Sequence, residues 1–324
     1  MKSPLRYPGG KTRAIKHLLP HIPEGDICSP FLGGGSLELV LAEDRKVYAY
    51  DAFYPLYNFW NCLLTDKEEL VKEVRALHPL DKQGFKALRE LIKAYNSNHP
   101  QSYVAAAAYY AINRSSFSGA TLSGGFSQQA ADGRFNENSI KRLENFDAPN
   151  LEVGFMSFEE SIELHENKFL YLDPPYFLGE KSNKLYGKAG DMHEGFDHEL
   201  LHLLLTNRQN WLLCYNNCEY IRDLYSDYEI IPAEWTYGMK NTISRTKQKE
   251  KKALREVQKQ NLSNMQELLD GFFKLSEENQ ETKISACFDK ISKELESCAK
   301  IDEEIKNFKQ DMKESSEIFI ISRG

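Results

Sequence analysis

The sequence predicts an α/β fold in which a mostly parallel sheet carries two helical insertions. Short apolar runs alternate with helical patterns in the first 64 residues. Strand patterns are then absent from residue 65 to 150, and a long charged helical pattern separates residue 241 from the last apolar run. Parallel strands covered by helices on both faces are nearly continuous apolar runs, and these runs fit that description.

Strands are expected where short apolar runs are bounded by polar or turn residues. In chain order these runs are Gly25–Phe31, Lys46–Asp51, Lys168–Leu172, Asn210–Tyr215, Tyr228–Tyr237 and Glu317–Ser322. A helix is expected after the first run, at Ser36–Ala42. In the first insertion a Ser/Gly-rich loop, Ser115–Ser127, follows three helical patterns, which are Lys67–Leu77, Gly84–Tyr95 and Ser102–Ile112. These patterns divide the chain into residues 1–64, 65–150, 151–241, 242–315 and 316–324.

The second insertion is rich in Lys, Glu, Gln and Ser and contains no proline. Its apolar residues recur in steps of three and four, which predicts helices. Two helices of about 30 residues that turn back near Ser276–Glu281 would form an antiparallel hairpin about 45 Å long. The alternative is one long dimeric coiled coil, which the drift away from strict heptads disfavours. The clearest stripe consists of Ile284, Phe288, Ile291, Leu295, Cys298, Ile301, Ile305, Phe308 and Met312.

Composition excludes several classes of protein. The 324 residues carry a net charge of −7, which argues against binding to polyanions over the whole surface but permits a local basic patch. The six cysteines are scattered without CxxC spacing, which indicates reduced thiols and neither a disulfide framework nor a metal site. No apolar run approaches the roughly 20 residues that span a bilayer, and the N-terminus lacks a signal-peptide core. We therefore expect a cytoplasmic protein that does not bind membranes.

The sharpest motif is Asp173-Pro174-Pro175-Tyr176, which directly follows the apolar run Lys168–Leu172. The prolines end the strand and stiffen a loop at the carboxyl edge of the sheet, where open α/β sheets bind ligands. The Asp173 carboxylate and the Pro174 carbonyl can both accept hydrogen bonds from an amino group on a flat ring. Tyr176 offers a face on which that ring can stack. A strand end with only a structural role is the alternative.

Two further segments are candidates for a ligand site. Pro30-Phe31-Leu32-Gly33-Gly34-Gly35-Ser36 joins the first strand to its helix, and three consecutive glycines let a ligand approach the backbone. Asp51 ends the next strand, where nucleotide-binding sheets place an acid for ribose hydroxyls. The segment Arg6-Tyr7-Pro8-Gly9-Gly10-Lys11 contains a turn close to the N-terminus. The GxxxxGK[ST] pattern of an ATPase is absent.

Together these residues resemble the Dam-like DNA adenine-N6 methyltransferases. RYPGGK is similar to their N-terminal cofactor motif, PFLGGGS to their glycine motif and DPPYF to their catalytic motif. The segment Ala108–Arg142 resembles their target-recognition module, and Asn210–Asn217, Trp235–Lys240 and Glu317–Arg323 fit as well. The resemblance covers about three-quarters of the chain. Two features depart from it: Ser157 stands where relatives often have an acid that contacts the cofactor, and relatives usually have a short loop in place of the second insertion.

The resemblance implies a Rossmann-like methyltransferase sheet with an antiparallel last strand, built from residues 1–64, 151–241 and 316–324. It implies transfer of methyl from S-adenosylmethionine to N6 of an adenine flipped out of duplex DNA, alone or as part of a restriction–modification pair, in a nucleoid-associated protein. The implied catalytic residues are Asp173, Pro174, Pro175 and Tyr176. The implied cofactor-binding residues are Tyr7, Gly10, Lys11, Phe31, Gly33, Gly35, Ser36, Asp51, Phe158 and Asp173.

DNA contacts are expected from the inserted module 65–150 and from the base of the second insertion. Arg and Asn make the bidentate contacts that distinguish bases, although phosphate contacts or loop scaffolding are equally open for each residue. The segment Lys240–Lys259 has eight basic residues against two acidic ones. Binding of a partner protein or a second subunit by the hairpin is the alternative. The DNA-binding candidates are Asn113, Arg114, Ser116, Arg134, Asn136, Lys240, Arg245 and Lys247.

Other functions remain open at this point. The same motif could serve cytosine N4, RNA adenine or a glutamine amide. A methyltransferase fold that has lost activity could instead act as a DNA-binding scaffold. The recognition module favours duplex DNA as the substrate, and the intact motifs argue against lost activity.

Overall fold

The computed structural model describes residues 1–177, 195–233 and 317–322, with parts of 256–267 and 290–300. The chain divides into two compact units, one made of residues 1–236 and 316–324 and the other of residues 237–315. Among the described residues no helix is long and apolar enough to cross a membrane.

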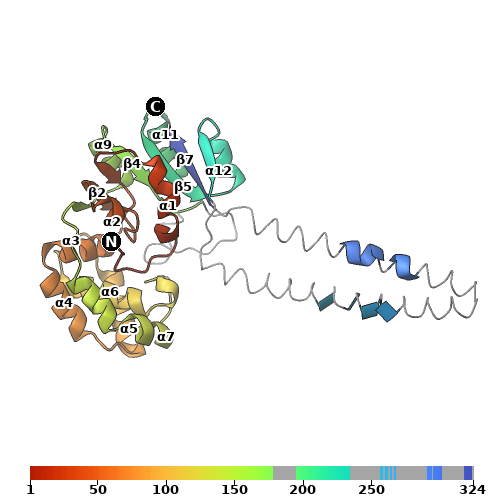
Figure 1. The fold of residues 1–324 in the computed structure, drawn as a ribbon. Coiled ribbons are helices and arrows are strands. Elements are labelled where there is room, and N and C mark those ends of the chain that lie inside the picture. Colours follow the sequence, from red (N-terminus) through yellow and green to blue (C-terminus); the bar gives the residue numbers. More distant parts are fainter. Residues whose placement is uncertain are drawn as a thin grey trace, which may run out of the picture. The chain divides into compact units, whose positions relative to one another are not determined.

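The first unit contains a seven-stranded sheet in the order β3-β2-β1-β4-β5-β7-β6 (Figure 1). Strands β1 to β5 are parallel, and β7 lies antiparallel between β5 and β6. The mostly parallel sheet and its antiparallel last strand are therefore confirmed. The strands are β1 Ile27–Ser29, β2 Val47–Asp51, β3 Leu151–Phe155, β4 Phe169–Leu172, β5 Trp211–Asn216, β6 Glu229–Pro232 and β7 Glu317–Ser322.

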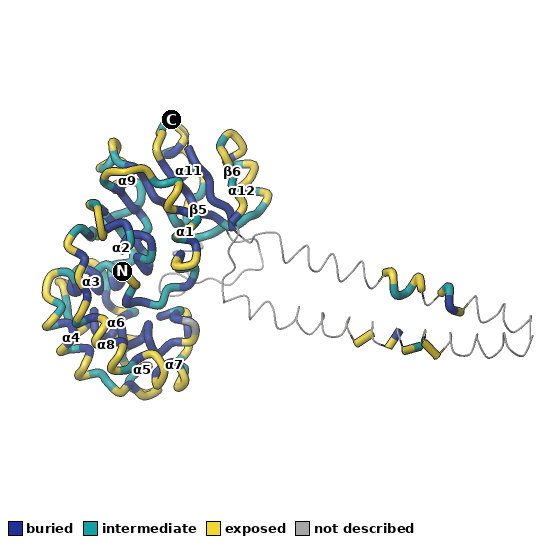
Figure 2. Tube along the Cα trace, in the orientation of Figure 1, coloured by how far each residue is buried: buried dark blue, intermediate teal, exposed yellow. Residues whose placement is uncertain are grey.

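Six of these strands fall on the predicted apolar runs, because their side chains fill the core. Strands β4, β5 and β7 are buried along almost their whole length (Figure 2). One face of the sheet packs against α9 Phe158–Leu164, α11 His198–Thr206 and α12 Glu219–Leu224. Strand β3 was not predicted. It pairs only with β2, and its exposed positions make its sequence too polar to stand out.

The N-terminal segment and the first crossover contain short helices. The predicted helix Ser36–Ala42 is present as a shorter one. These elements are η1 Lys11–Arg13, α1 Ile15–Leu18, η2 Leu19–His21 and α2 Glu38–Leu41.

The inserted module is a group of helices beside the sheet (Figure 1). The three predicted helices are present as α4, α5 and α6, and α6 is central because every residue from Ala105 to Ser115 is buried. Helix α3 precedes the predicted boundary at residue 65 and packs against both α6 and β3. The helices are α3 Tyr54–Thr65, α4 Lys67–Ala76, α5 Lys82–Ala94, α6 Tyr103–Ser115, α7 Gln128–Arg134 and α8 Glu137–Glu144.

The Ser/Gly-rich loop after α6 folds back on itself. Ser116 forms an isolated bridge with Phe126, and the N–H of Phe117 donates to the carbonyl of Gly125. A short 3-10 helix, η3 Phe117–Gly119, lies at the start of this loop.

The second insertion lies mostly outside the described residues. Its described residues between 256 and 267 and between 290 and 300 are helical, as the sequence predicts. Within this unit Asn261 Nδ2 donates to Ser297 Oγ at 3.0 Å.

Candidate active site

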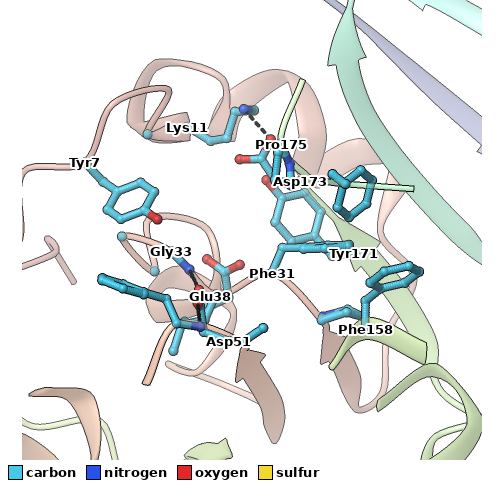
Figure 3. A pocket seen from close by; sticks show the side chains of 18 of the residues that line it. Tyr7, Lys11, Phe31, Gly33, Glu38, Asp51, Phe158, Tyr171, Asp173 and Pro175 are labelled. Carbon is cyan, nitrogen blue, oxygen red and sulfur yellow. Dashed lines mark hydrogen bonds and ion pairs between the residues drawn. The ribbon is translucent and has the colours of Figure 1, made fainter. Parts of the chain in front are cut away.

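The N-terminal segment forms a turn that packs against the glycine loop. The N–H of Gly10 donates to the carbonyl of Tyr7 at 3.1 Å, and Gly9 has φ of 75°. Tyr7 in turn lies against the glycine loop (Figure 3). A Cβ at Gly34 would lie 2.6 Å from the Tyr7 Cβ, so a side chain there would displace the tyrosine. The sequence therefore needs glycine where two loops meet.

The glycine loop is tied to the end of β2 through Asp51. The N–H of Gly33, whose φ is 50°, donates to Asp51 Oδ2 at 3.0 Å, and the N–H of Phe53 donates to Oδ1 at 2.9 Å. Burial raises the pKa of Asp51 to about 6, although these two N–H groups oppose the rise. A carboxylate fixed in this way can accept hydrogen bonds from a ligand with its remaining lone pairs.

Asp173 lies directly after β4 and forms an ion pair with Lys11. Lys11 Nζ is 2.6 Å from Asp173 Oδ1 (Figure 3). It also donates to Tyr176 Oη at 2.8 Å. The Lys11 side chain is 3% exposed and the Asp173 side chain 22%. Burial raises the pKa of Asp173, and the charge and hydrogen bond of Lys11 oppose that rise. Lys11 therefore joins the predicted cofactor segment to the predicted catalytic corner.

A cavity of about 330 Å³ connects these groups (Figure 3). One wall is aromatic: the rings of Phe31 and Phe158 stack with centroids 5.7 Å apart, and Phe196 contacts both. Asp173 and Pro175, from the predicted catalytic motif, also line the cavity. Its volume lies within the range of small-molecule sites. All ten predicted cofactor residues line it: Tyr7, Gly10, Lys11, Phe31, Gly33, Gly35, Ser36, Asp51, Phe158 and Asp173.

The structure adds lining residues that the motifs did not reveal. Glu38, at the start of α2, lines the cavity, as do Phe196 and Glu159. Ser157, where an acid was expected, caps α9: its hydroxyl accepts from the N–H of Glu160, and the Glu160 carboxylate accepts from the N–H of Ser157. The sequence motif S-x-x-E could have revealed this capping box. Burial of Glu38 depends on tertiary packing, so no local signal could have revealed it.

Three predicted DNA contacts require correction because their side chains lie in the interior. The Asn113 side chain donates to the carbonyl of Arg6 and accepts from the N–H of Arg6, so it holds the N-terminal segment. Arg114 Nε donates to the carbonyl of Arg134 at 2.8 Å, and Ser116 is fully buried. These side chains are buried and hydrogen-bonded within the fold, so they are not exposed for contact with base edges. Asn113, Arg114 and Ser116 are therefore scaffold residues.

The other DNA-binding candidates stay predictions. Arg134 is exposed at the end of α7, and the half-buried Asn136 caps α8 by accepting from the N–H of Ser139. Lys240, Arg245 and Lys247 lie outside the described residues.

Two further residues, Phe117 and Arg6, were not predicted from the sequence to contact DNA. Phe117 is 63% exposed, which is unusual for so large an apolar side chain. Burial, followed by the charges of Arg134 and Arg114, lowers the pKa of Arg6 to about 10. Three guanidinium groups therefore lie within electrostatic reach of one another.

The comparisons with known proteins agree with this site. A family model described as D12 class N6 adenine-specific DNA methyltransferase matches residues 7–239, more than two thirds of the chain. A search among curated proteins finds no significant match. The matched residues include the inserted helices, and they also include the turn at Tyr7, the glycine loop and the Asp-Pro-Pro-Tyr corner, which the fold brings together at one cavity. The chain therefore belongs to the D12 class of N6 adenine-specific DNA methyltransferases and is an enzyme that methylates adenine at specific DNA sites.

Proposed function

We propose that the methyl donor is S-adenosylmethionine, bound in the cavity, and that the target adenine enters at Asp173 after flipping out of the duplex. The observation that carries this proposal is the position of Asp173. It lines the same cavity as the glycine loop and Asp51, so a donor and an acceptor of the methyl group can meet there. An adenine that is stacked inside the DNA duplex cannot reach such a site, and flipping it out costs a few kcal/mol.

The residues of the cavity fit this cofactor. The glycine loop lines the cavity with backbone that a ligand can approach closely, and Asp51 can accept hydrogen bonds from ribose hydroxyls. Phe31, Phe158 and Phe196 provide flat apolar surfaces for an adenine ring. When bound, the cofactor supplies a methyl group activated by a sulfonium.

Asp173 and the Pro174 carbonyl would accept hydrogen bonds from the amino group of the target adenine. Lys11 binds Oδ1 of Asp173, and a carboxylate has acceptor sites on both oxygens, so Oδ2 can serve the amine. These acceptors favour a pyramidal nitrogen and stabilise the positive charge that develops on it during transfer. Lys11 also fixes the Tyr176 hydroxyl, which orients the ring for stacking on the base, worth about 1–3 kcal/mol.

The surface near Arg134 supports the expected approach of DNA. Arg6 and Arg134 can contact phosphates, while Arg114 adds positive charge from the interior. Phe117 projects from the loop after α6 and can fill space left in the base stack.

The second insertion leaves and rejoins the sheet at the carboxyl edge. The N–H of Ala233 donates to the carbonyl of Glu317 at 2.9 Å, so the described residues that flank the insertion are hydrogen-bonded to each other. We propose that the positively charged start of the insertion, Lys240–Lys259, contacts DNA. We also propose that its two helical arms are antiparallel, which the hydrogen bond between Asn261 and Ser297 supports. Binding of a partner protein or a second subunit is the alternative. Deleting residues 246–313 should weaken DNA binding and flatten its salt dependence, whereas unchanged salt dependence would favour the partner.

The direct test is transfer of tritium from labelled S-adenosylmethionine to unmethylated duplex DNA, followed by nucleoside analysis. We expect N6-methyladenine from the wild-type protein and none from Asp173→Ala, which should still bind the cofactor. Detection of methylated cytosine, or a preference for RNA over DNA, would assign a different substrate to the enzyme. Absence of transfer with cofactor and DNA both bound would favour a scaffold.

We further propose that the protein acts in the cytoplasm, in association with the nucleoid.

A further inference from the structure

Glu38 is a buried acid in the wall of the cavity, and the catalytic roles above do not use it. It is the first residue of α2, directly after the glycine loop, and only 3% of it is exposed. Its Oε1 accepts a hydrogen bond from Ser29 Oγ at 2.7 Å. Within the described part of the chain it forms no ion pair with a basic side chain. Acids are seldom buried so completely without a cation, because losing water is costly for the charged form.

The surroundings of Glu38 leave it between two charge states near neutral pH. Burial raises its pKa to about 7, the charge of Asp173 adds to the rise, and Ser29 and nearby backbone N–H groups oppose it. Tyr171 of β4 also lies within electrostatic reach. Lys11 is paired with Asp173. A positive charge entering the cavity would therefore shift Glu38 toward its ionised form.

We propose that Glu38 is a positioning residue that recognises the positive charge of the methyl donor and distinguishes S-adenosylmethionine from its neutral product, S-adenosylhomocysteine. This inference rests on the proposed cofactor. The methyl group must reach an amine held at Asp173, and Glu38 lines the same cavity within electrostatic reach of Asp173. We therefore expect the charge that carries the methyl to lie within reach of the Glu38 carboxylate, since Glu38 and Asp173 line the same cavity (Figure 3).

The proposal predicts a proton release that differs between the two ligands. At pH 7 a carboxyl group with a pKa of about 7 is half protonated, so binding of the sulfonium should release about half a proton from Glu38. The thioether carries no such charge and should release almost none from this group. Asp51, whose pKa is about 6, faces the ribose proposed for both ligands, so its contribution is the same for both.

Isothermal titration calorimetry tests this on the full chain, with both ligands in two buffers of different ionisation enthalpy at pH 7. The variant is Glu38→Gln, which keeps the size of the side chain and an acceptor for Ser29. We expect the wild-type protein to release about half a proton more with S-adenosylmethionine than with S-adenosylhomocysteine, and the variant to show no difference. The affinity ratio between the two ligands should fall about tenfold in Glu38→Gln, the change that one pKa unit of differential interaction gives. Asp51→Asn is the matched control, since it should weaken both ligands equally.

A purely structural role for Glu38 would leave the affinity ratio unchanged and weaken both ligands alike. That result, or equal proton release on binding of the two ligands to the wild-type protein, would overturn the inference about Glu38 and leave the proposed cofactor in place. The second of these measurements needs no variant, so it holds even if Glu38→Gln folds poorly. Failure of the wild-type protein to bind either ligand would overturn the proposed cofactor, and this inference with it.

Discussion

Replacing Lys11 with methionine should leave the carboxylate of Asp173 without its ion-pair partner. The variant keeps a long unbranched side chain but removes the ammonium group that lies 2.6 Å from Asp173 Oδ1. Removing one partner of a buried ion pair costs about 3–5 kcal/mol. Asp173 is 22% exposed and can gain water, so we expect the lower end, about 3 kcal/mol. For a domain of this size that lowers the melting temperature by about 6–12 °C.

The pH dependence identifies the cause of this loss. A carboxyl group whose pKa is raised in the folded protein favours folding at low pH, and that contribution is lost as pH rises through the folded value. Burial already raises the pKa of Asp173, and removing Lys11 should raise it further. Lys11→Met should therefore lose much more stability at pH 8 than at pH 5, relative to the wild-type protein.

Thermal melts at the two pH values provide the measurement. Adding Asp173→Asn to Lys11→Met removes the stranded charge and should recover most of the loss at pH 8. Lys16→Met, which changes an exposed lysine of α1, is the control and should change stability by less than about 0.5 kcal/mol. A loss that is equal at both pH values, or additive losses in the double variant, would refute the role assigned to the ion pair.

Three further changes test the site and its surroundings. Gly34→Ala places a Cβ against a tyrosine side chain and should weaken cofactor binding at least tenfold in a calorimetric titration, whereas Gly125→Ala, which meets nothing within 4 Å, should not. Arg114→Ala removes buried hydrogen bonds and should destabilise the fold by about 1–3 kcal/mol in chemical denaturation. Arg134 is exposed, so Arg134→Ala should leave stability unchanged but weaken DNA binding and reduce its salt dependence. Phe117→Ala should slow methylation of fully paired DNA more than of DNA with a mismatch at the target adenine in single-turnover assays, and equal slowing would exclude a role in flipping.

The strands were predictable where burial on both faces left a continuous apolar signal. Residues of β4 and β5 are almost all buried, so their hydrophobicity is required by the fold and visible in the sequence. Strand β3 differs because it has a neighbour on one side only, and Glu152 and Phe155 on it are exposed. An edge strand of five residues has little reason to be apolar, so its sequence resembles that of a loop.

The cavity was predictable because its motifs follow strands directly. The carboxyl ends of parallel β1, β2 and β4 meet at one edge, so the glycine loop, Asp51 and Asp173 had to lie close together. The position of Lys11 was not predictable in the same way. Its segment precedes the first strand, and only the folded chain places its ammonium group on a carboxylate 162 residues away.

The error at Asn113 and Arg114 has a physical cause. Arg and Asn side chains in a recognition module resemble base-reading groups, but they also satisfy buried backbone groups. Asn113 does so for Arg6, 107 residues earlier in the chain. Such long-range contacts leave no mark in the local pattern, so exposure had to decide between the two roles.

The position of β7 explains how the sheet accommodates a long insertion between its last two strands in the sequence. Strand β7 lies between β5 and β6, so the sheet is completed only after the chain returns from the insertion. Loop-closure entropy grows slowly with length, so a longer connection at this point costs little. Glu317 pairs with Asn216, whose Nδ2 donates to the carbonyl of Phe177, the residue after Tyr176. Glu317, where the described chain rejoins the sheet, is thus linked through Asn216 to the loop that carries the Asp-Pro-Pro-Tyr motif, at the edge where the proposed DNA substrate must approach.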